Sequence, residues 1–271
     1  EAIFTVLSSQ FKVRRSIKNY NNEIGVPLTI IGAEAPGKSL FGWCFVFMKA
    51  LWLILVKNKN YPEILVLEMG VDKPGDMDYL TKIVRCDVAV VTSIGPSHLE
   101  FFETTEKIKK EKGILVSTLK KGGFAVLNYD DKKVREISEL STSRIITYGF
   151  KNEAEVKAQN LIFSFEESGK IQDLSGLSFK LNYNGSVVPV KIPRAIGFPA
   201  IYSSLAATSV GITFDMNLVE ISSALNNFFL PPGRMNLIKG IKQTLIIDDT
   251  YNASPQSSLS AIQFMEKINL E

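Results

Sequence analysis

Two polar residues stand where strands of a buried sheet would end. Glu68 lies near the end of an apolar run at residues 64–69, and His98 follows a second run at residues 88–92. A carboxylate in such a position either binds Mg²⁺, which prefers oxygen ligands and shares its shell with nucleotide phosphates, or caps the next helix. His98 is the only histidine of the chain, so a zinc site built from several histidines is excluded. It is either a ligand near Glu68 or a structural histidine.

Basic residues provide a second set of candidates. Residues 107–112 are rich in lysine, which is typical of a solvated helix face, and nothing in the composition singles out Lys112. Arg234 follows a Pro-Pro-Gly turn, where a guanidinium suits bidentate contact with phosphate or carboxylate and equally suits solvent. The polar loop at residues 248–255 follows an apolar run and can hold Asp249 and Asn252 against a ligand.

Residues 32–39 match the spelling of a Walker A phosphate loop, Gly-Ala-Glu-Ala-Pro-Gly-Lys-Ser, and we expect them to follow a strand and precede a helix. A phosphate loop points consecutive backbone N–H groups at phosphate, and Pro36 has none. Glu34 also adds negative charge to the proposed cradle. Both features favour an ordinary turn carrying Lys38 over a phosphate-binding loop.

The elements that position these residues alternate between strands and helices. Short apolar runs predict strands, and helical patterns at residues 77–84 and 105–119 lie between them. Strands connected in this way form a mainly parallel sheet flanked by helices, an α/β fold that binds its ligands at the carboxyl ends of the strands. The predicted strands are residues 28–31, 64–69, 88–92, 125–128 and 145–148.

The pattern changes between residues 158 and 192. Alternating segments separated by Gly and Asn turns, such as the turn at Asn184, predict a small antiparallel β segment there. Helical and strand patterns resume after it. We expect helices at residues 200–210 and 218–228, a strand pair at residues 235–239 and 244–248, and a closing helix at residues 257–268.

Composition narrows the class of protein. The 271 residues are 45% hydrophobic and 22% charged, which excludes a disordered or fibrous chain. A net charge of +3 spread along the chain gives no basic stripe for a nucleic acid. Two cysteines, Cys44 and Cys86, are too few for a disulfide framework and fit a cytoplasmic protein. The chain begins at Glu1 without an export leader, so we expect a truncated start.

Residues 41–56 are apolar enough to raise the question of a membrane. Lys49 interrupts the run, which is shorter than the ~20 residues of a membrane-spanning helix. We expect a buried or interfacial helix rather than stable insertion. Aromatic residues flanked by lysines leave peripheral contact with a membrane surface open. These residues are Trp43, Phe45, Phe47, Trp52, Lys57 and Lys59.

Seven stretches, taken in order, resemble the Mur ligase family and most closely its D-alanyl-D-alanine-adding branch. They run almost from end to end of the chain, from Asn-Tyr-Asn-Asn-Glu-Ile-Gly-Val-Pro at residues 19–27 to Asp-Asp-Thr-Tyr-Asn-Ala-Ser-Pro at residues 248–255. Each stretch alone is weak, but seven in the family's order are specific. The others are Leu-Glu-Met-Gly (67–70) with Pro-Gly-Asp (74–76), Ile-Gly-Pro-Ser-His-Leu-Glu (94–100), Glu-Lys-Gly (111–113), Leu-Asn-Tyr-Asp (127–130) and Gly-Arg-Met (233–235).

The resemblance implies an ATP-dependent ligase of peptidoglycan biosynthesis. Such enzymes phosphorylate the carboxylate of a UDP-N-acetylmuramoyl-peptide with ATP, and an incoming amine, here D-alanyl-D-alanine or an amino acid, attacks the acyl phosphate. Two Mg²⁺ ions and a carbamylated lysine serve that step. By position in the motifs, Lys112 resembles the carbamylated lysine. The resemblance implies that Lys112 and His98 are the catalytic residues. It also implies that Glu68, His98 and Lys112 are the metal ligands. Arg234 and Asp249 resemble contacts to the ATP phosphates, Asn252 the residue beside adenosine, and Asn21 and Asn22 the muramoyl-substrate side.

The chain also departs from the family. The family's phosphate loop would precede Glu1, so residues 1–256 are expected to form a central ATP-binding domain without it, with an antiparallel insertion at about 156–192. Residues 257–271 would lead as a helix to a carboxy-terminal domain. Pro199 and Ala200 stand where the family has a His-Asn or His-Gln pair, which removes an expected adenine contact.

Two other classes of protein stay open beside the ligase. One is a phosphate-loop nucleotide-binding module that uses residues 32–39, and the other is a non-catalytic, membrane-associated interaction domain built around residues 41–56. Neither class needs the motifs at residues 19–27 and 248–255, so these motifs favour the ligase.

Overall fold

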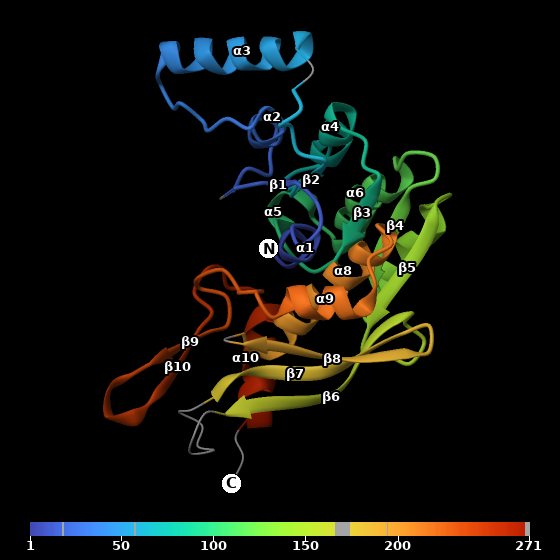
Figure 1. Cartoon of the computed structure of the whole chain (residues 1–271), viewed down its shortest axis with the longest axis vertical. Coiled ribbons are helices and arrows are strands. Elements are labelled where there is room, and N and C mark those ends of the chain that lie inside the picture. Colours follow the sequence, from blue (N-terminus) through green and yellow to red (C-terminus); the bar gives the residue numbers. More distant parts are fainter. Residues whose placement is uncertain (18, 57, 166–173, 194, 269–271) are drawn as a thin grey trace.

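A six-stranded sheet forms the centre of the computed structural model, which describes residues 1–17, 19–56, 58–165, 174–193 and 195–268 (Figure 1). Its strand order is β3-β4-β5-β6-β7-β8, parallel from β3 to β6 and antiparallel from β6 to β8. The predicted α/β fold, with a mainly parallel sheet and a small antiparallel segment, is confirmed. The strands are β3 (Val88–Val91), β4 (Phe124–Asn128), β5 (Arg144–Gly149), β6 (Val156–Phe165), β7 (Leu174–Tyr183) and β8 (Ser186–Pro193).

The antiparallel part of this sheet depends on one tight turn. Asn184 and Gly185 connect β7 to β8 directly, and both have positive φ, 48° and 79°. An Asn-Gly pair adopts this conformation at low cost, and its twist matches that of the flanking strands. The long hairpin therefore follows from the sequence signal that predicted it.

Two smaller strand pairs lie outside the six-stranded sheet. β1 (Val13–Arg15) pairs in parallel with β2 (Ile64–Val66), and β9 (Asn236–Lys239) pairs antiparallel with β10 (Leu245–Asp248). Apolar residues of β2 and of β3 pack against the same hydrophobic core. Within the described part of the chain, however, no hydrogen-bonded ladder joins these two strands. Each therefore has one edge without a partner strand.

Helix α8 (Gly197–Thr213) is the central helix of the core. It packs against α1 (Ala2–Leu7), α9 (Leu218–Leu225) and the sheet, and 11 of its 17 residues are buried. Its buried hydroxyls, on Ser204, Thr208 and Ser209, donate to the carbonyls four residues earlier, so burial leaves none of them unpaired. The other helices are α4 (Asp76–Ile83), α5 (Leu99–Phe102), α6 (Thr105–Ser117), α7 (Lys132–Glu136), α10 (Pro255–Ile268) and two 3₁₀ turns (Ile137–Leu140, Ile241–Gln243).

The predicted strand at residues 28–31 is wrong, because these residues belong to helix α2 (Gly25–Ile31). A four-residue apolar run cannot distinguish a buried strand from a buried helix face. The flanking residues decide: the Asn22 side-chain oxygen accepts hydrogen bonds from the N–H groups of Ile24 and Gly25 at the start of the helix. Gly32 ends it in the left-handed conformation, with φ 71°.

The Walker A spelling consequently lacks its expected context. Residues 32–39 follow a helix rather than a strand and lead into α3 (Leu40–Leu55). Their groups serve local structure: the Tyr20 hydroxyl accepts from the Ala35 N–H, and the Ser39 side chain accepts from the Gly42 N–H to cap α3. This segment is a connection between two helices.

Helix α3 projects from the body of the molecule and packs chiefly against α2 (Figure 1). Val46 is its one buried residue, so the expectation of a buried helix is wrong and that of a helix at an interface stays a prediction. Lys57, one of the predicted flanking lysines, lies outside the described residues. No helix in the described ranges is both long and apolar enough to cross a membrane.

Candidate functional site

The loops at the carboxyl ends of β2 and β3 contain two of the predicted site residues. Glu68 follows β2, and His98 lies in the loop after β3, directly before α5. His98 is half-exposed and has φ 52° and ψ 35°, a left-handed conformation in which a residue other than glycine is strained. Its Nε2 lies 3.4 Å from Oδ1 of Asp72, in the loop after β2. The histidine therefore joins the loops after two different strands.

Glu68 lies beside Asn21, in the stretch at residues 19–27. Asn21 Nδ2 lies 3.4 Å from Glu68 Oε1, and the Asn21 carbonyl accepts from the Gly70 N–H at 2.7 Å. A Cβ at Gly70 would stand 3.0 Å from the Asn21 side chain, so this close approach favours glycine. Asn21 and Glu68 are thus brought together, whereas the side-chain oxygen of Asn22 is engaged in starting α2.

Lys112 differs from the neighbouring lysines of α6 in its surroundings. Its Nζ donates to the Ser93 carbonyl at 2.9 Å, in the loop after β3. Burial lowers the pKa of the Lys112 amine below its ordinary value, and the Asp131 carboxylate opposes that shift. Lys109, by contrast, pairs with the exposed carboxylates of Glu106 and Glu136. The structure thus separates Lys112 from the solvated face of the helix, which composition alone did not.

Glu111 is a positioning residue that sequence reasoning did not single out. Its Oε1 accepts from the Gly75 N–H at 3.0 Å and from the Met77 N–H at 2.8 Å, and the side chain is buried. It therefore holds the start of α4 against α6, next to Lys112. The signal was present in the quoted Glu-Lys-Gly stretch, but a carboxylate in a charged run gives no sign of being buried.

The residues that end β4 were also missed. Asn128 Nδ2 donates to the Thr92 carbonyl at 2.9 Å, and Asp131 accepts from the Ile94 N–H at 2.9 Å while capping α7. These bonds fix both sides of the loop that presents the Ser93 carbonyl to Lys112.

Asp130 connects the same region to the central helix. It accepts from the Phe150 N–H at 2.7 Å and from the Tyr202 hydroxyl at 2.9 Å, and a Cβ at Gly149 would lie 2.7 Å from its carboxylate. Burial and the nearby Asp130 raise the pKa of Tyr202, so its hydroxyl keeps its proton and donates. In the Leu-Asn-Tyr-Asp stretch, Asn128 thus binds the loop after β3 and Asp130 binds Tyr202 of α8.

The predicted phosphate-contact residues form a second group. The Arg234 guanidinium lies over the Tyr251 ring, 4.2 Å from its centroid, and Asp249 Oδ1 accepts from the Met235 N–H at 3.2 Å. Gly233, with φ 73°, lets the Tyr251 backbone approach: a Cβ there would stand 3.0 Å from the Tyr251 nitrogen. Asn252 is exposed in the same loop.

One hydrogen bond connects this second group to the first. The Tyr251 hydroxyl donates to Asn19 Oδ1 at 2.7 Å, and Asn19 belongs to the segment that also contains Asn21. Residues more than two hundred positions apart in the chain therefore meet at one place. The contact joins the motif at residues 19–27 to the motif at residues 248–255.

The donor set suits Mg²⁺ only in part. Across the described residues no group of three or more His, Cys, Asp or Glu side chains is close enough to hold a metal ion. Glu68 offers oxygens and His98 a nitrogen, but the ammonium of Lys112 repels a cation. A carbamate on Lys112 would supply the missing oxygens. The convergence of Glu68, His98 and Lys112 around one ion stays a prediction.

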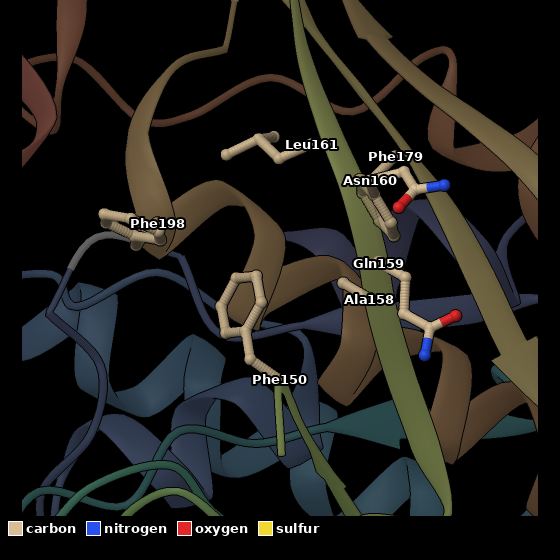
Figure 2. A pocket seen from close by; sticks show the side chains of 7 residues that line it. All are labelled: Phe150, Ala158, Gln159, Asn160, Leu161, Phe179 and Phe198. Carbon is tan, nitrogen blue, oxygen red and sulfur yellow. The ribbon is translucent and has the colours of Figure 1, made fainter. Parts of the chain in front are cut away.

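A cavity of about 340 Å³ lies beside the start of α8 (Figure 2). Its walls are mostly apolar, with the rings of Phe150 and Phe198 in edge-to-face contact at 5.7 Å, and its polar groups are the amides of Gln159 and Asn160. A Cβ added at Gly197, next to Phe198, would stand 2.9 Å from the end of the Met235 side chain, and Met235 follows Arg234. The start of α8 therefore lies beside the residue that follows Arg234.

The mainly parallel sheet, with polar loops at the carboxyl ends of its strands, is typical of α/β domains that bind nucleotides. Residues 50–193, more than half of the chain, match the family model described as the Mur ligase middle domain. The chain belongs to that family.

Several individual proteins are similar to this chain over nearly its whole length. The chain is 28% identical over 255 residues to the UDP-N-acetylmuramoyl-tripeptide–D-alanyl-D-alanine ligase of Buchnera aphidicola subsp. Baizongia pistaciae, covering 94% of this chain and 48% of the relative. It is 28% identical over 268 residues to the Bacillus subtilis enzyme of the same name, covering 99% and 50%. A crystal structure of Thermotoga maritima MurF ligase in complex with ADP superposes with a TM-score of 0.76 at 26% identity, covering 98% and 53%. The chain thus spans about half the length of the relatives it matches.

Proposed function

We propose that this chain is the ATP-handling part of a ligase that joins D-alanyl-D-alanine, or an amino acid, to a UDP-N-acetylmuramoyl-peptide in peptidoglycan synthesis. The observation that carries the proposal is Lys112, a partly buried amine held on the Ser93 carbonyl at the carboxyl edge of the sheet. A partly buried lysine at this edge needs an explanation that a solvated helix face does not supply. The two free cysteines fit a reaction in the cytoplasm.

The proposed reaction has two steps. A carboxylate oxygen of the muramoyl-peptide attacks the γ-phosphorus of ATP, and ADP leaves. The amine of the second substrate then attacks the carbonyl carbon of the acyl phosphate, inorganic phosphate leaves, and the amine loses a proton. Bound Mg²⁺ would neutralise the phosphate charge that builds up during the transfer.

Each predicted residue has a task in this scheme. Glu68 and His98 would hold the metal ion, and a carbamate on Lys112, formed when the neutral amine adds CO₂ and releases a proton, would orient it. The lowered pKa of Lys112 favours the neutral amine that this addition needs. Arg234, preorganised on the Tyr251 ring, would contact the ATP phosphates.

Asn21, beside Glu68, would face the muramoyl substrate. We propose that Asn22 also lies on the muramoyl-substrate side. Its side-chain oxygen caps the start of α2, so it would act by positioning the segment that contains Asn21. Asp249 and Asn252 would lie along the nucleotide. The cavity at Phe150 and Phe198 is the place we propose for the adenine ring, because it combines aromatic walls with two amides.

We also propose that residues 1–256 are a central domain whose sheet takes in one further parallel strand from the same protein, carrying the phosphate loop. The support is the pair of unpartnered edges on β2 and β3, which pack on one core without a ladder between them. A second observation agrees: the Glu1 carboxylate pairs with Arg15, the last residue of β1, so the start of α1 lies at the carboxyl end of the β1–β2 pair. Helix α10 would lead on to a carboxy-terminal domain.

The test uses the complete protein that contains this chain. ADP release should require both a UDP-N-acetylmuramoyl-tripeptide and D-alanyl-D-alanine, and should fall below detection in Glu68→Ala. If ADP release proceeded without either substrate, or if Glu68→Ala were fully active, the ligase proposal would be wrong. A phosphate-loop module on residues 32–39 predicts instead that Lys38→Ala abolishes nucleotide binding.

A further inference from the structure

Helix α3 has an apolar surface that the ligase function does not use. All of its exposed side chains are apolar except Cys44, and Phe41 and Ile54 are 90% and 80% exposed. A water-facing helix normally carries charged or polar residues on its outer face. Exposed apolar patches of this kind indicate an interaction site. The exposed apolar residues are Leu40, Phe41, Phe45, Phe47, Met48, Leu51, Trp52, Ile54 and Leu55.

The one charged residue within α3 is turned towards the protein. The Lys49 ammonium donates to the Gly32 carbonyl, at the carboxyl end of α2. That end is also held by Arg14, whose guanidinium donates to the Ile30 carbonyl, and by the Tyr61 hydroxyl, which donates to the same carbonyl. Lys49 thus fastens α3 to α2 and leaves the outer face of α3 without charge.

Length and position exclude a spanning helix but fit one that lies flat. Sixteen residues at 1.5 Å each give about 24 Å, which is less than the ~30 Å hydrocarbon thickness of a bilayer. The helix stands clear of the sheet and its covering helices, so a flat surface can reach its outer side (Figure 1). The exposed apolar residues cover most of the circumference of α3, so the side that faces away from α2 presents an almost unbroken apolar surface.

Charge around α3 favours an anionic surface. Two of the lysines between Ala33 and Asn60, Lys38 and Lys59, are exposed beside the helix, against one exposed acidic residue, Glu34. Lys38, before α3, and Lys59, after it, are exposed at the two ends of the helix. Basic residues beside an apolar helix are attracted to anionic headgroups.

We propose that α3 docks this protein on the surface of a membrane that contains anionic lipids, with its outer apolar face in the headgroup and acyl-chain boundary. The proposal does not depend on the ligase assignment. In this arrangement Lys38 and Lys59 face the lipid headgroups, and the inward Lys49 leaves the immersed face of α3 without charge.

The experiment is flotation of the complete protein with vesicles of phosphatidylglycerol and phosphatidylethanolamine, compared with vesicles of phosphatidylcholine alone. The unaltered protein should float with the anionic vesicles. The double variant Phe45→Gln, Phe47→Gln should lose at least about tenfold in vesicle partitioning, because membrane affinity scales with the apolar surface immersed. Lys38→Gln with Lys59→Gln should weaken binding to anionic vesicles and leave the weak binding to phosphatidylcholine unchanged.

The matched control is the pair Val219→Gln and Ile241→Gln, which removes exposed apolar side chains from other parts of the surface, 68% and 82% exposed. It should float like the unaltered protein. An environment-sensitive dye on Cys44 should report an apolar surrounding only with anionic vesicles. Absence of flotation, or equal loss in the α3 and control variants, would overturn the proposal. Protection of Cys44 from the dye in solution would also overturn it, because the helix would then already be covered. A protein that forms dimers, loses them on the α3 substitutions and binds no vesicles would overturn it as well.

Discussion

At the scale of single residues, the surroundings of a side chain matter more than its type. Lys109, Lys110 and Lys112 belong to one helix, yet their partners differ: Lys112 donates to the Ser93 carbonyl and has a lowered pKa, whereas Lys109 pairs with Glu106 and Glu136. Arg234 is likewise held by one contact, the Tyr251 ring. These two side chains are the ones on which substitutions in the complete protein should have the sharpest effects.

Lys112→Ala should remove most of the ligase activity of the complete protein, and a short carboxylate such as acetate should restore part of it. The reason is that the carbamate acts as an anion that orients the metal ion, and a small anion can enter the space left by the side chain. Steady-state ADP release, with and without acetate, measures both effects. Carbon-13-labelled bicarbonate should also give a carbamate signal that Lys112→Ala lacks.

The controls for this prediction are Lys109→Ala and Lys110→Ala. Both should keep near-normal turnover, since Lys109 pairs with the exposed carboxylates of Glu106 and Glu136. If all three alanine variants had the same activity, Lys112 would be an ordinary surface lysine, and the metal site would lose its support.

Arg234→Lys should raise the KM for ATP by about tenfold, because lysine keeps the charge but loses the planar fork and much of the stacking, an effect worth roughly 1–2 kcal/mol. The affinity for the muramoyl-peptide should stay the same. Tyr251→Phe is the matched control: it keeps the ring under the guanidinium and removes only the hydroxyl that reaches Asn19. Equal KM values for ATP in Arg234→Lys and the unaltered protein would count against the phosphate-contact role.

At the scale of elements, a buried carboxylate of α6 forms hydrogen bonds with the start of α4. Glu111 accepts from two N–H groups at the start of α4, and it precedes Lys112 directly on α6. The loop between β2 and α4, which contains Asp72 and so reaches His98, is thereby fixed relative to Lys112. Glu111 therefore links the stability of the helix pair to the geometry of the candidate metal site.

Glu111→Ala should lower the stability of this domain by about 2–3 kcal/mol, because it leaves two backbone N–H groups without an acceptor in a buried place. Glu111→Gln should cost less, since the amide retains one acceptor oxygen. Thermal unfolding of the complete protein measures the difference. Glu106→Ala, on the exposed face of the same helix, is the control and should leave the unfolding temperature unchanged; a Glu111→Ala protein as stable as this control would refute the capping role.

Sequence patterns predicted most elements, and the failures have physical causes. Long segments with a clear period, such as α6 and the hairpin of β7 and β8, are where they were expected. Residues 28–31 were assigned to a strand because a short apolar run has no period, and only the Asn22 contacts decide for a helix. Glu111 and Asp131 escaped notice because their roles depend on backbone groups far away in the sequence.

At the scale of the whole molecule, the sheet is in two parts. β1 with β2 and the six strands from β3 to β8 pack on one core, yet among the described residues β2 and β3 each have an edge without a partner strand. An unpaired strand edge exposes hydrogen-bonding groups and invites pairing with other chains. The residues of this chain alone should therefore be less stable than the complete protein, and more prone to aggregate.

The 271-residue chain by itself should bind Mg-ATP weakly, since the proposed phosphate loop would supply most of the charge-assisted contacts. Isothermal titration calorimetry of the chain and of the complete protein, side by side, measures the difference. Tight binding by the chain alone that disappears in Lys38→Ala would contradict this expectation and would assign nucleotide binding to residues 32–39.

The position of the tryptophans has a consequence for experiments on this chain. The chain has two, Trp43 and Trp52, and both lie on α3. Intrinsic emission excited at the red edge of the aromatic absorption band would therefore follow one peripheral helix, while far-ultraviolet circular dichroism would follow all helices and strands, most of which lie outside α3. A lower unfolding midpoint by emission than by circular dichroism would mean that α3 separates from α2 before the core unfolds. Such a difference would not indicate a partly folded core.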